Sequence, residues 1–458
     1  MKNRRRSNVK HEAFHYRTLD QLRQTLRRLG LTLPLSENYS VLAQPLRLKN
    51  GKASPNRIAV QPMEGCDGTP DGRPGALTLR RYKRFAESGA GMIWAEATAV
   101  CAEGRANPRQ LWICPENVGA LGRMVEQIKE TSMKKNGFAP LVIMQATHSG
   151  RYAKPNGVPE PVIAYQNPLF EKTKPISPAS IITDDELKAL EELYGRAARL
   201  AEQAGFDGID IKACHRYLVS ELLSAYGRPG IYGGSFENRT RLYRNAALSA
   251  RAAVSSGMLV TSRLNVYDGF PYPYGFGVTE RGGLEPALGE PLRLVQMLRD
   301  TCGFELLNVT AGNPYVNPHV NRPYDRGAYE PPEHPLEGVE RMLRCVGQIA
   351  KGCPDMQIIG SGFSYLRQFS AALAAGAVES GVCAAAGFGR AFFAYPEFPR
   401  DLLLNDAMRP EKCCVACGKC TELMRAGSMA GCVVQDRVVY QPIYRRDVQG
   451  ENTGEVYR

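Results

Sequence analysis

Short apolar runs alternate with amphipathic stretches along most of this chain, from about residue 57 to residue 405. Runs of four to eight apolar residues are typical of parallel strands that are covered on both faces. Apolar residues three and four positions apart indicate helices. The expected strands are 57–62, 92–95, 140–145, 208–211, 260–263, 306–310, 357–360 and 381–384, and the expected helices are 78–88, 116–131, 183–204, 236–256, 290–301, 336–351, 365–375 and 396–405.

Strands that alternate with helices in this way predict an α/β fold, a (β/α)8 TIM barrel. A doubly wound sheet is the alternative, but it needs a glycine fingerprint after the first strand, and Pro62–Gly68 does not provide one. The barrel is expected over residues 46–408. Residues 1–45 form an N-terminal extension whose helix starts after Thr18 and ends at Gly30, and residues 409–458 form a C-terminal cysteine-rich segment.

Composition adds little to this fold prediction but limits the location of the protein. The formal net charge is +12, and its densest basic run is Arg4–Arg6. Elsewhere acids and bases are mixed, which indicates a solvated surface with a modest bias towards anionic ligands. No apolar segment follows the basic start and no run of about 18 apolar residues occurs, so we expect a cytoplasmic protein without a membrane span.

Five of the thirteen cysteines lie between Cys413 and Cys432. Cys414, Cys417, Cys420 and Cys432 have the spacing C-x2-C-x2-C-x11-C, which is typical of iron–sulfur ligation and predicts a [4Fe-4S] cluster. Zinc is the next alternative, although it prefers two separated C-x2-C pairs, and free thiols come last. Cys413 is expected to be a bystander or a replacement for Cys414.

Candidate catalytic residues follow the expected strands, where a barrel places its active site. Gly362, Gly389 and Arg390 follow the last two strands, where glycine backbone and a guanidinium can bind a phosphate. The long segments 151–182 and 313–335 are expected to line or cover the pocket.

Several motifs resemble those of the old yellow enzyme family of NADH:flavin oxidoreductases. Gln145–Arg151 resembles its Q-x-x-H-x-G-R segment, Lys212–Leu218 its H-x-x-H-x-Y-L segment, and Tyr232–Arg239 its Y-G-G-S-x-x-N-R signature. Pro62-Met63 and Gly387–Arg390 also match in order and spacing. The resemblance covers roughly residues 40–440.

The resemblance implies FMN as a non-covalent cofactor, NAD(P)H as reductant, and reduction of the activated C=C bond of an enone- or enoate-type small molecule. Tyr217 would supply a proton, while Lys212 and His215 would bind the substrate oxygen. The FMN-binding residues carried over from the family are Pro62, Met63, Ala97, Gln145, Arg263, Gly362, Gly389 and Arg390.

Lys212 departs from the family, which usually has histidine at that position. A lysine is a longer and more mobile cation, so it favours a carboxylate or a polarised carbonyl if it points into the pocket. The alternative is that it points into solvent and leaves His215 alone.

The cluster motif resembles that of 2,4-dienoyl-CoA reductase and trimethylamine dehydrogenase, which continue into nucleotide-binding domains. This sequence stops at Arg458. Either NAD(P)H therefore reduces FMN directly or an electron-donor protein supplies the cluster. Glu64 occupies the position at which trimethylamine dehydrogenase links its flavin to cysteine, and Cys66 is out of register, so no covalent flavin is expected.

Ene-reduction is the first functional prediction. Amine dehydrogenation is the runner-up, against which Lys212 argues, because a cationic amine favours an aromatic cage. An FMN-barrel enzyme that modifies RNA is a different class, but no stripe of stacking aromatics supports a nucleic-acid partner. A non-catalytic electron-transfer subunit would not need Tyr217 and His215. The substrate and the oligomeric state, including a homo-oligomer, stay open.

Overall fold

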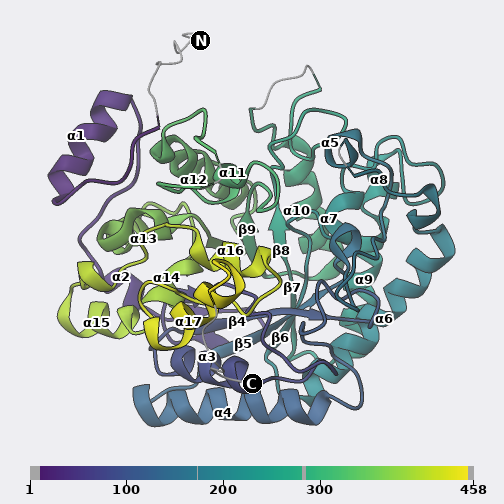
Figure 1. Ribbon diagram of the computed structural model, residues 1–458, viewed down its shortest axis with the longest axis horizontal. Coiled ribbons are helices and arrows are strands. Elements are labelled where there is room, and N and C mark those ends of the chain that lie inside the picture. Colours follow the sequence, from purple (N-terminus) through teal and green to yellow (C-terminus); the bar gives the residue numbers. More distant parts are fainter. Residues whose placement is uncertain (1–10, 173, 281–284, 328, 452–458) are drawn as a thin grey trace.

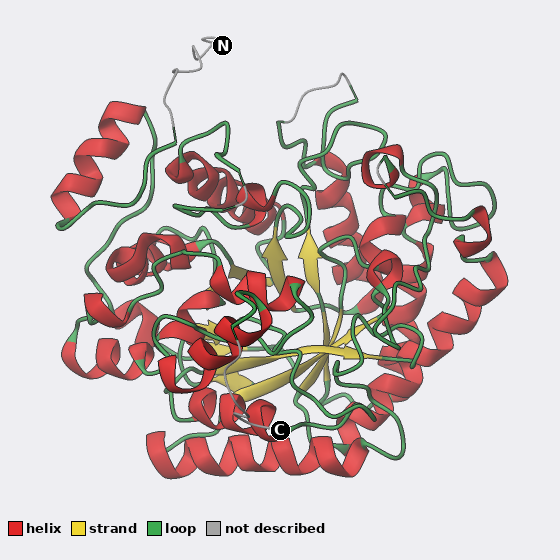
Figure 2. Ribbon diagram, viewed as in Figure 1, coloured by secondary structure: helices red, strands yellow, loops and turns green. Residues whose placement is uncertain are grey.

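A parallel β-barrel surrounded by helices forms the body of the protein (Figures 1 and 2). The computed structural model describes residues 11–172, 174–280, 285–327 and 329–451. The basic run Arg4–Arg6 and the last residue, Arg458, lie outside them. The strands are β1 (Leu46–Arg47), β2 (Ala53–Ser54), β3 (Ile58–Val60), β4 (Met92–Ala99), β5 (Leu141–Thr147), β6 (Gly208–Ile211), β7 (Leu259–Thr261), β8 (Arg263–Asn265), β9 (Leu306–Thr310), β10 (Gln357–Gly360) and β11 (Ala385–Phe388).

Helices follow the barrel strands and cover their outer side (Figure 2). The helices of the described residues, including those of the N- and C-terminal segments, are α1 (Leu19–Leu29), α2 (Ser40–Ala43), α3 (Ala76–Ala86), α4 (Val118–Asn136), α5 (Pro168–Glu171), α6 (Asp184–Gln203), α7 (Leu218–Leu222), α8 (Phe236–Arg239), α9 (Arg241–Ala253), α10 (Gly289–Cys302), α11 (Pro318–Asn321), α12 (Pro335–Gly352), α13 (Ser370–Glu379), α14 (Arg390–Ala394), α15 (Phe398–Asn405), α16 (Lys419–Arg425) and α17 (Arg437–Asp447). Short 3₁₀ turns span Gly150–Tyr152, Pro178–Ser180, Phe363–Phe369 and Pro410–Lys412.

The sheet order confirms the predicted barrel. Within the described ranges the strands pair as β7-β6-β5-β4-β3-β11-β10-β9-β8, and every pair in that sheet is parallel. The single strand expected at 260–263 is two short strands, because the chain changes partner at Ser262. β7 pairs with β6, β8 pairs with β9, and a bridge from Ala213 to Leu264 closes the ring.

Two expected elements near the end of the barrel were wrong in position. The eighth strand is Ala385–Phe388 rather than 381–384, because Gly381 adopts a left-handed conformation just after α13, at φ +73°. The expected helix 365–375 is a 3₁₀ segment followed by α13, and Arg367 breaks the helical backbone between them with φ +51°.

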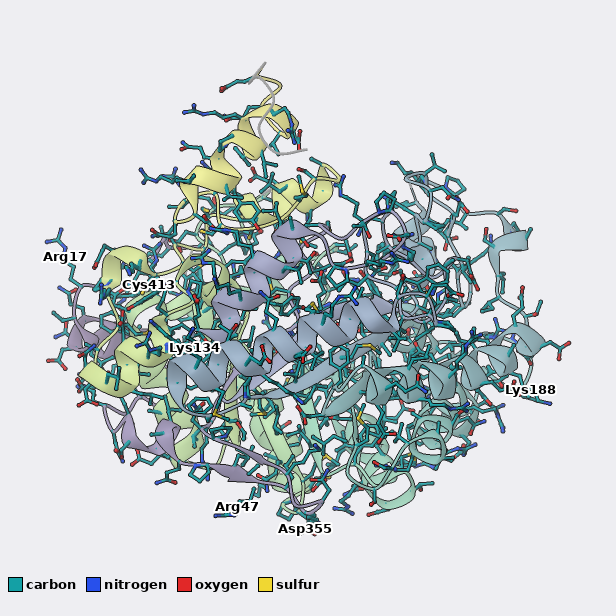
Figure 3. The ribbon with its side chains drawn as sticks, turned by 90° about the horizontal axis from the view of Figure 1, so that it is seen from below. Arg17, Arg47, Lys134, Lys188, Asp355 and Cys413 are labelled. Atoms are coloured by element: carbon teal, nitrogen blue, oxygen red, sulfur yellow. The ribbon has the colours of Figure 1, made fainter. Side chains whose placement is uncertain are left out.

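The barrel interior is apolar at the amino-terminal ends of the strands. Met92, Trp94 and Ile143 pack there with Leu46 and Leu48 of the β1–β2 hairpin, which covers that end. Arg47 on this hairpin and Asp355 before β10 lie at the end of the molecule away from the C-terminal segment (Figure 3). The site is therefore expected at the opposite mouth.

The two flanking segments pack on the barrel (Figure 1). Helix α1 begins after Thr18, whose side chain accepts from the backbone N–H of Gln21, and ends at Gly30 with φ +64°, as predicted. In the C-terminal segment, Asp436 accepts hydrogen bonds from Arg80 and Arg84 of α3. No helix in the described residues is long and apolar enough to cross a membrane.

Candidate active site

A cavity of about 990 Å³, counting the space open to solvent, lies at the carboxyl ends of the barrel strands. Its lining combines residues that are far apart in the sequence. The predicted site residues that line it are Pro62, Met63, Ala97, Lys212, His215, Tyr217, Arg263, Gly362, Gly389 and Arg390.

Gln145 is the predicted flavin residue that does not line this cavity. Its amide donates a hydrogen bond of 2.6 Å to Asp210, which also accepts from the Trp94 indole at 2.7 Å and from the Arg263 backbone at 2.7 Å. Burial raises the pKa of Asp210 to about 6. Gln145 therefore does not face the cavity. It holds the Asp210 carboxylate, which in turn fixes the backbone of Arg263.

One part of the cavity is strongly electropositive. Burial lowers the pKa of Arg263, and its Nε has no hydrogen-bond partner among the described residues. Burial, and then repulsion by Arg390, lower the pKa of Arg322. Gly362 adopts φ +100° beside them. Buried guanidinium groups without carboxylate partners, next to glycine backbone, fit an anion such as a phosphate.

Beside this electropositive part of the cavity, β11 packs closely against the end of β3. A Cβ on Gly387 would stand 1.9 Å from Nε2 of Gln61, and one on Gly389 would stand 2.9 Å from the sulfur of Met63. The Gln61 amide is fixed by hydrogen bonds of 3.1 Å to Asn308 and to Ser361. Because these glycines have no side chain, the Pro62-Met63 turn can pack closely against Gly387–Arg390, the segment expected to bind a phosphate.

Lys212 points into the cavity and contacts the candidate proton donor. Its Nζ lies 3.7 Å from the centroid of the Tyr217 ring, and the residue is only 5% exposed. Burial lowers the pKa of Lys212, while the nearby Cys214 and Glu64 oppose this shift. Burial raises the pKa of Glu64, which also lines the cavity. The solvated alternative for Lys212 does not hold.

His215 supplies a neutral donor or acceptor at the same place. Burial and the charges of Arg263 and Lys212 hold its pKa well below the usual value, and its Nε2 has no partner within the described part of the chain. A buried polar atom without a partner is costly, so it is expected to be satisfied by a ligand.

Tyr217 is buried at the first turn of α7, and its hydroxyl lies 3.2 Å from that of Tyr315. Burial raises the pKa of Tyr217 well above its usual value, and Tyr315 and Glu64 act in the same direction. The phenol is therefore protonated at neutral pH and can act as an acid.

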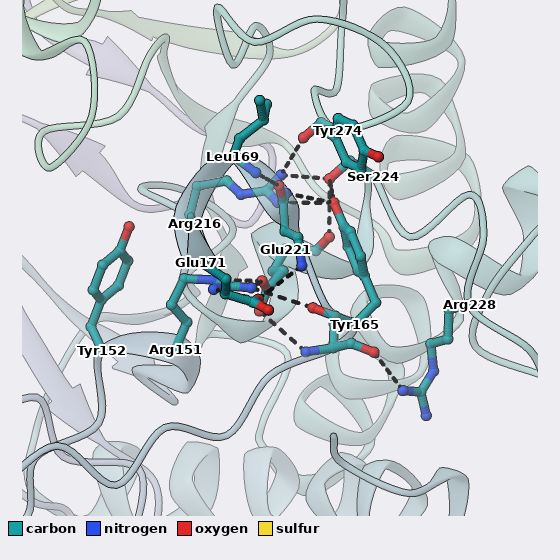
Figure 4. Close-up of polar contacts among 12 residues, drawn as sticks. Arg151, Tyr152, Tyr165, Leu169, Glu171, Arg216, Glu221, Ser224, Arg228 and Tyr274 are labelled. Carbon is teal, nitrogen blue, oxygen red and sulfur yellow. Dashed lines mark hydrogen bonds and ion pairs between the residues drawn. The ribbon is translucent and has the colours of Figure 1, made fainter. Parts of the chain in front are cut away.

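The backbone before Tyr217 is unusual, because His215 and Arg216 both have left-handed conformations, with φ +63° and +59°. The fully buried Arg216 anchors this turn (Figure 4). It donates to Asp268 at 3.1 Å, to the Tyr274 carbonyl at 3.1 Å and to the Tyr165 hydroxyl at 3.0 Å. Side chains from the long loops thus hold the turn that presents Tyr217.

Arg151, from the motif after β5, extends the same network. Its Nε donates to Glu221 of α7 at 2.8 Å, and its Nη1 donates to Glu171 at 3.1 Å (Figure 4). The segment 151–182 thus supports α7 and the turn before it, but none of its described residues lines the cavity, so the expectation that it borders the pocket is not confirmed.

Sequence reasoning missed Glu64, Tyr315 and Arg322 as residues that line the cavity. Tyr315 and Arg322 belong to the long segment after β9, which has no periodic pattern and matches no motif. The expectation that segment 313–335 lines the pocket was the only signal for them. Glu64 was considered only as the position of a covalent flavin link, although its adjacency to the Pro62-Met63 pair indicates that it lines the cavity.

The four motif cysteines line a second, smaller cavity of about 380 Å³, counting space open to solvent. Ala416 and Gly418 turn the chain between them with φ +54° and +79°, and the backbone N–H of Gln435 donates to the sulfur of Cys432 at 3.3 Å. Burial raises the pKa of Cys414, an effect that the Arg390 guanidinium opposes. Within the described ranges no three His, Cys, Asp or Glu side chains are placed to hold a metal ion.

Arg390 lines both the large cavity and the cysteine cavity. Cys413 also borders the smaller one, but its thiol donates to the Arg409 carbonyl. The cysteine segment is therefore adjacent to the electropositive part of the main cavity.

Comparison with known proteins agrees with this geometry. The model of the NADH:flavin oxidoreductase / NADH oxidase family matches residues 41–280. An NADPH dehydrogenase from Clostridium acetobutylicum is 29% identical over 271 residues, which are 58% of this chain and 72% of that protein. One from Halalkalibacterium halodurans is 33% identical over 195 residues, 41% of this chain and 53% of the relative.

Solved structures show the same fold at low sequence identity. A 2-naphthoyl-CoA reductase complex superposes with a TM-score of 0.70 and 20% identity, over 87% of this chain and 57% of that one. An old yellow enzyme homologue from Zymomonas mobilis gives a TM-score of 0.60 and 23% identity, over 81% of this chain and 94% of that one. The chain thus spans little more than half of several proteins that it matches.

Proposed function

Because the chain belongs to the NADH:flavin oxidoreductase / NADH oxidase family, and is a flavin-dependent oxidoreductase, we propose that it reduces an activated C=C bond. The substrate class is an α,β-unsaturated carbonyl, carboxyl or thioester compound. The observation that carries this proposal is the meeting of Tyr217, Lys212 and His215 in one cavity with the electropositive glycine-rich wall.

The cavity fits FMN. Arg390, Gly362 and Gly389, with Arg322 added by the structure, would hold the phosphate, and Arg263 would lie at the ring edge where negative charge develops. Pro62, Met63 and Ala97 would contact the ring, and Gln145 would support Arg263 through Asp210. When bound, FMN accepts two electrons from NAD(P)H and supplies hydride to one carbon of the alkene.

The protein supplies the proton and the charge stabilisation. Tyr217, a protonated phenol in the cavity, gives a proton to the other alkene carbon. The Lys212 ammonium and the neutral His215 imidazole donate hydrogen bonds to the substrate oxygen, where negative charge builds up as the hydride arrives. The unpartnered Nε2 of His215 supports this role.

A second candidate, oxidation of an amine, is favoured by one observation. The Glu64 carboxyl group lines the cavity and could attract an ammonium group. The buried cations Lys212 and Arg263 in the same cavity oppose it, so it ranks below ene-reduction.

We further propose that residues 409–458 form a separate segment that binds a [4Fe-4S] cluster through Cys414, Cys417, Cys420 and Cys432. Their convergence on one cavity and their C-x2-C-x2-C-x11-C spacing support this ligand set. Residues 46–408 would then form the FMN barrel and residues 1–45 an N-terminal extension, of which the described residues 11–45 pack against it.

The test is an oxygen-free absorbance titration of the purified holoprotein. NADPH or NADH should bleach the flavin band, and 2-cyclohexen-1-one, cinnamate or crotonyl-CoA should restore it. Tyr217→Phe should be bleached like the wild type but should recover about 10² to 10⁴ times more slowly, because the general acid is lost.

The control outcomes separate the alternatives. If none of the three alkenes restores the band, or if Tyr217→Phe slows bleaching and recovery equally, ene-reduction with this acid is excluded. Bleaching by an amine without any nicotinamide would establish the second candidate instead.

A further inference from the structure

The hydroxyl of Tyr315 lies next to that of Tyr217, and the Tyr315 side chain is held in place by its own contacts with Tyr152 and Asn313. Its ring stacks on that of Tyr152, with centroids 4.0 Å apart and an interplanar angle of 26°. Its backbone amide donates to the Asn313 side chain at 2.7 Å, and Asn313 in turn donates to the Tyr152 hydroxyl at 3.3 Å. The residue is 37% exposed overall and also lines the cavity.

We propose that Tyr315 is a positioning residue for the reaction: its hydroxyl donates a hydrogen bond to the oxygen of Tyr217 and stabilises the phenolate that proton transfer leaves. This inference rests on the proposed function, in which Tyr217 is the acid. The carrying observation is the 3.2 Å separation of the two hydroxyl oxygens, one of which belongs to the fully buried Tyr217.

The direction of this hydrogen bond follows from the proton balance. Before the reaction either phenol can donate to the other. When Tyr217 gives its proton to the alkene carbon, a C–H bond forms, the O–H bond of Tyr217 breaks, and its oxygen keeps the electron pair. From then on only Tyr315 can donate. Water later returns a proton to Tyr217, which completes the cycle without a further oxidant or reductant.

The surroundings of the Tyr217 oxygen favour a hydrogen bond from the Tyr315 hydroxyl. Burial raises the pKa of Tyr315 above its usual value, although the hydrogen bond with Tyr217 opposes this shift, so Tyr315 is protonated at neutral pH and has a proton to donate. A bare phenolate in a site shielded from water would carry a large desolvation cost. The Lys212 ammonium over the Tyr217 ring helps through its charge, whereas the nearby Glu64 opposes a second negative charge.

The experiment uses Tyr315→Phe in the FMN-loaded enzyme, because this change keeps the ring that stacks on Tyr152. The reduced enzyme is mixed rapidly with whichever of 2-cyclohexen-1-one, cinnamate and crotonyl-CoA reoxidises the wild type. We expect recovery of the flavin band to slow about tenfold to a hundredfold, the range for a lost hydrogen bond to a charged group.

A second readout separates this role from simple packing. Without the donor, proton transfer should control more of the rate, so the solvent deuterium isotope effect on recovery should rise, while bleaching by NAD(P)H should not change. Tyr324→Phe is the matched control: it removes a hydroxyl from the same segment whose bond goes to the Tyr329 carbonyl. It should match the wild type in both phases.

Each outcome is decisive. Tyr315→Phe that recovers like the wild type, or that slows both phases with an unchanged isotope effect, overturns the inference. If Tyr217→Phe is slow while Tyr315→Phe is not, only this inference fails. If Tyr217→Phe also behaves like the wild type, or if no alkene reacts, the proposed function fails and this inference fails with it.

Discussion

At the scale of single residues, Lys212 shows how burial changes the meaning of a substitution. A lysine in place of the family's usual histidine could have been an exposed charge. The structure instead places it over the ring of Tyr217, in a cavity that also contains Arg263 and Glu64. The pKa of Lys212 is therefore lower than that of a free lysine, because burial disfavours the charged form.

A pH dependence follows from this lowered pKa. Lys212 is charged below its pKa and loses the charge as pH rises through it, at a pH below about 10.4, the ordinary lysine value. Alkene reduction should therefore fall over that alkaline range, before Tyr217 ionises. Lys212→Met should be about tenfold to a hundredfold slower at neutral pH and should lack this decline.

The measurement is the rate of flavin reoxidation between pH 6 and about 10.5, just above the ordinary lysine value. Lys212→Arg is the control, because a guanidinium stays charged across this range and should remove the decline whatever its rate at neutral pH. The groups that also face Lys212 are Glu64, Asp210, Cys214 and Arg263. A Lys212→Met profile parallel to that of the wild type would contradict the assignment.

At the scale of elements, the turn before α7 depends on ion pairs that no local pattern encodes. Arg216 and Asp268 are both buried, and they come from the turn after β6 and from the loop after β8. Arg216→Met would leave Asp268 as a buried charge without its partner, which costs about 3–5 kcal/mol. We expect a clear fall in melting temperature, measured by circular dichroism.

Two comparisons test this explanation. Adding Asp268→Leu to Arg216→Met removes the stranded charge and should recover part of the loss. Arg299→Met, which breaks an exposed pair with Asp300 on α10, should leave the melting temperature nearly unchanged. Equal melting of Arg216→Met and the wild type would show that the turn is held by something else.

The elements also show what the sequence could predict. Strands β6, β9 and β10 have the predicted bounds, because each is a short, mostly apolar run between turn residues. The split at Ser262 could not be predicted, since it depends on which neighbour each half pairs with when the barrel closes. Likewise, the strand Ala385–Phe388 follows an equally apolar stretch, and burial alone does not fix its register.

The same limit applies to the site. Lys212, His215 and Tyr217 belong to one short motif, so their spacing in the sequence is enough to predict that they lie together at the end of one strand. Tyr315 and Arg322 reach the cavity from a segment without regular spacing, through the Tyr152 stack and the turn around α11. Only the tertiary fold brings Tyr315 to the oxygen of Tyr217 and Arg322 to the electropositive part of the cavity near Arg390.

At the scale of the whole molecule, the barrel cavity and the cysteine cavity share Arg390, and the cysteine segment is fixed to the barrel. Asp436 links α17 to α3 through Arg80 and Arg84, and the Arg322 side chain donates to Thr421, next to Cys420, at 2.6 Å. A cluster held by this segment would therefore have a short, protein-filled route to the flavin site, and the enzyme would have two entrances for electrons.

Removing one ligand separates the two entrances. Cys417→Ala should lower the iron content from about four atoms per chain to near zero and keep FMN, since none of the four cysteines lines the flavin cavity. Bleaching by NADPH should stay close to the wild-type rate, because hydride transfer needs only the barrel. Bleaching by reduced methyl viologen, a one-electron donor, should slow, because that route uses the cluster.

Cys413→Ala is the matched control for this experiment, because Cys413 neighbours the ligand set but donates its thiol hydrogen to Arg409. It should keep both iron and the viologen route. Iron lost from Cys413→Ala but kept in Cys417→Ala would overturn the ligand set. Equal viologen rates in Cys417→Ala and the wild type, with iron lost, would show that the cluster supports the segment structurally and carries no electrons to the barrel.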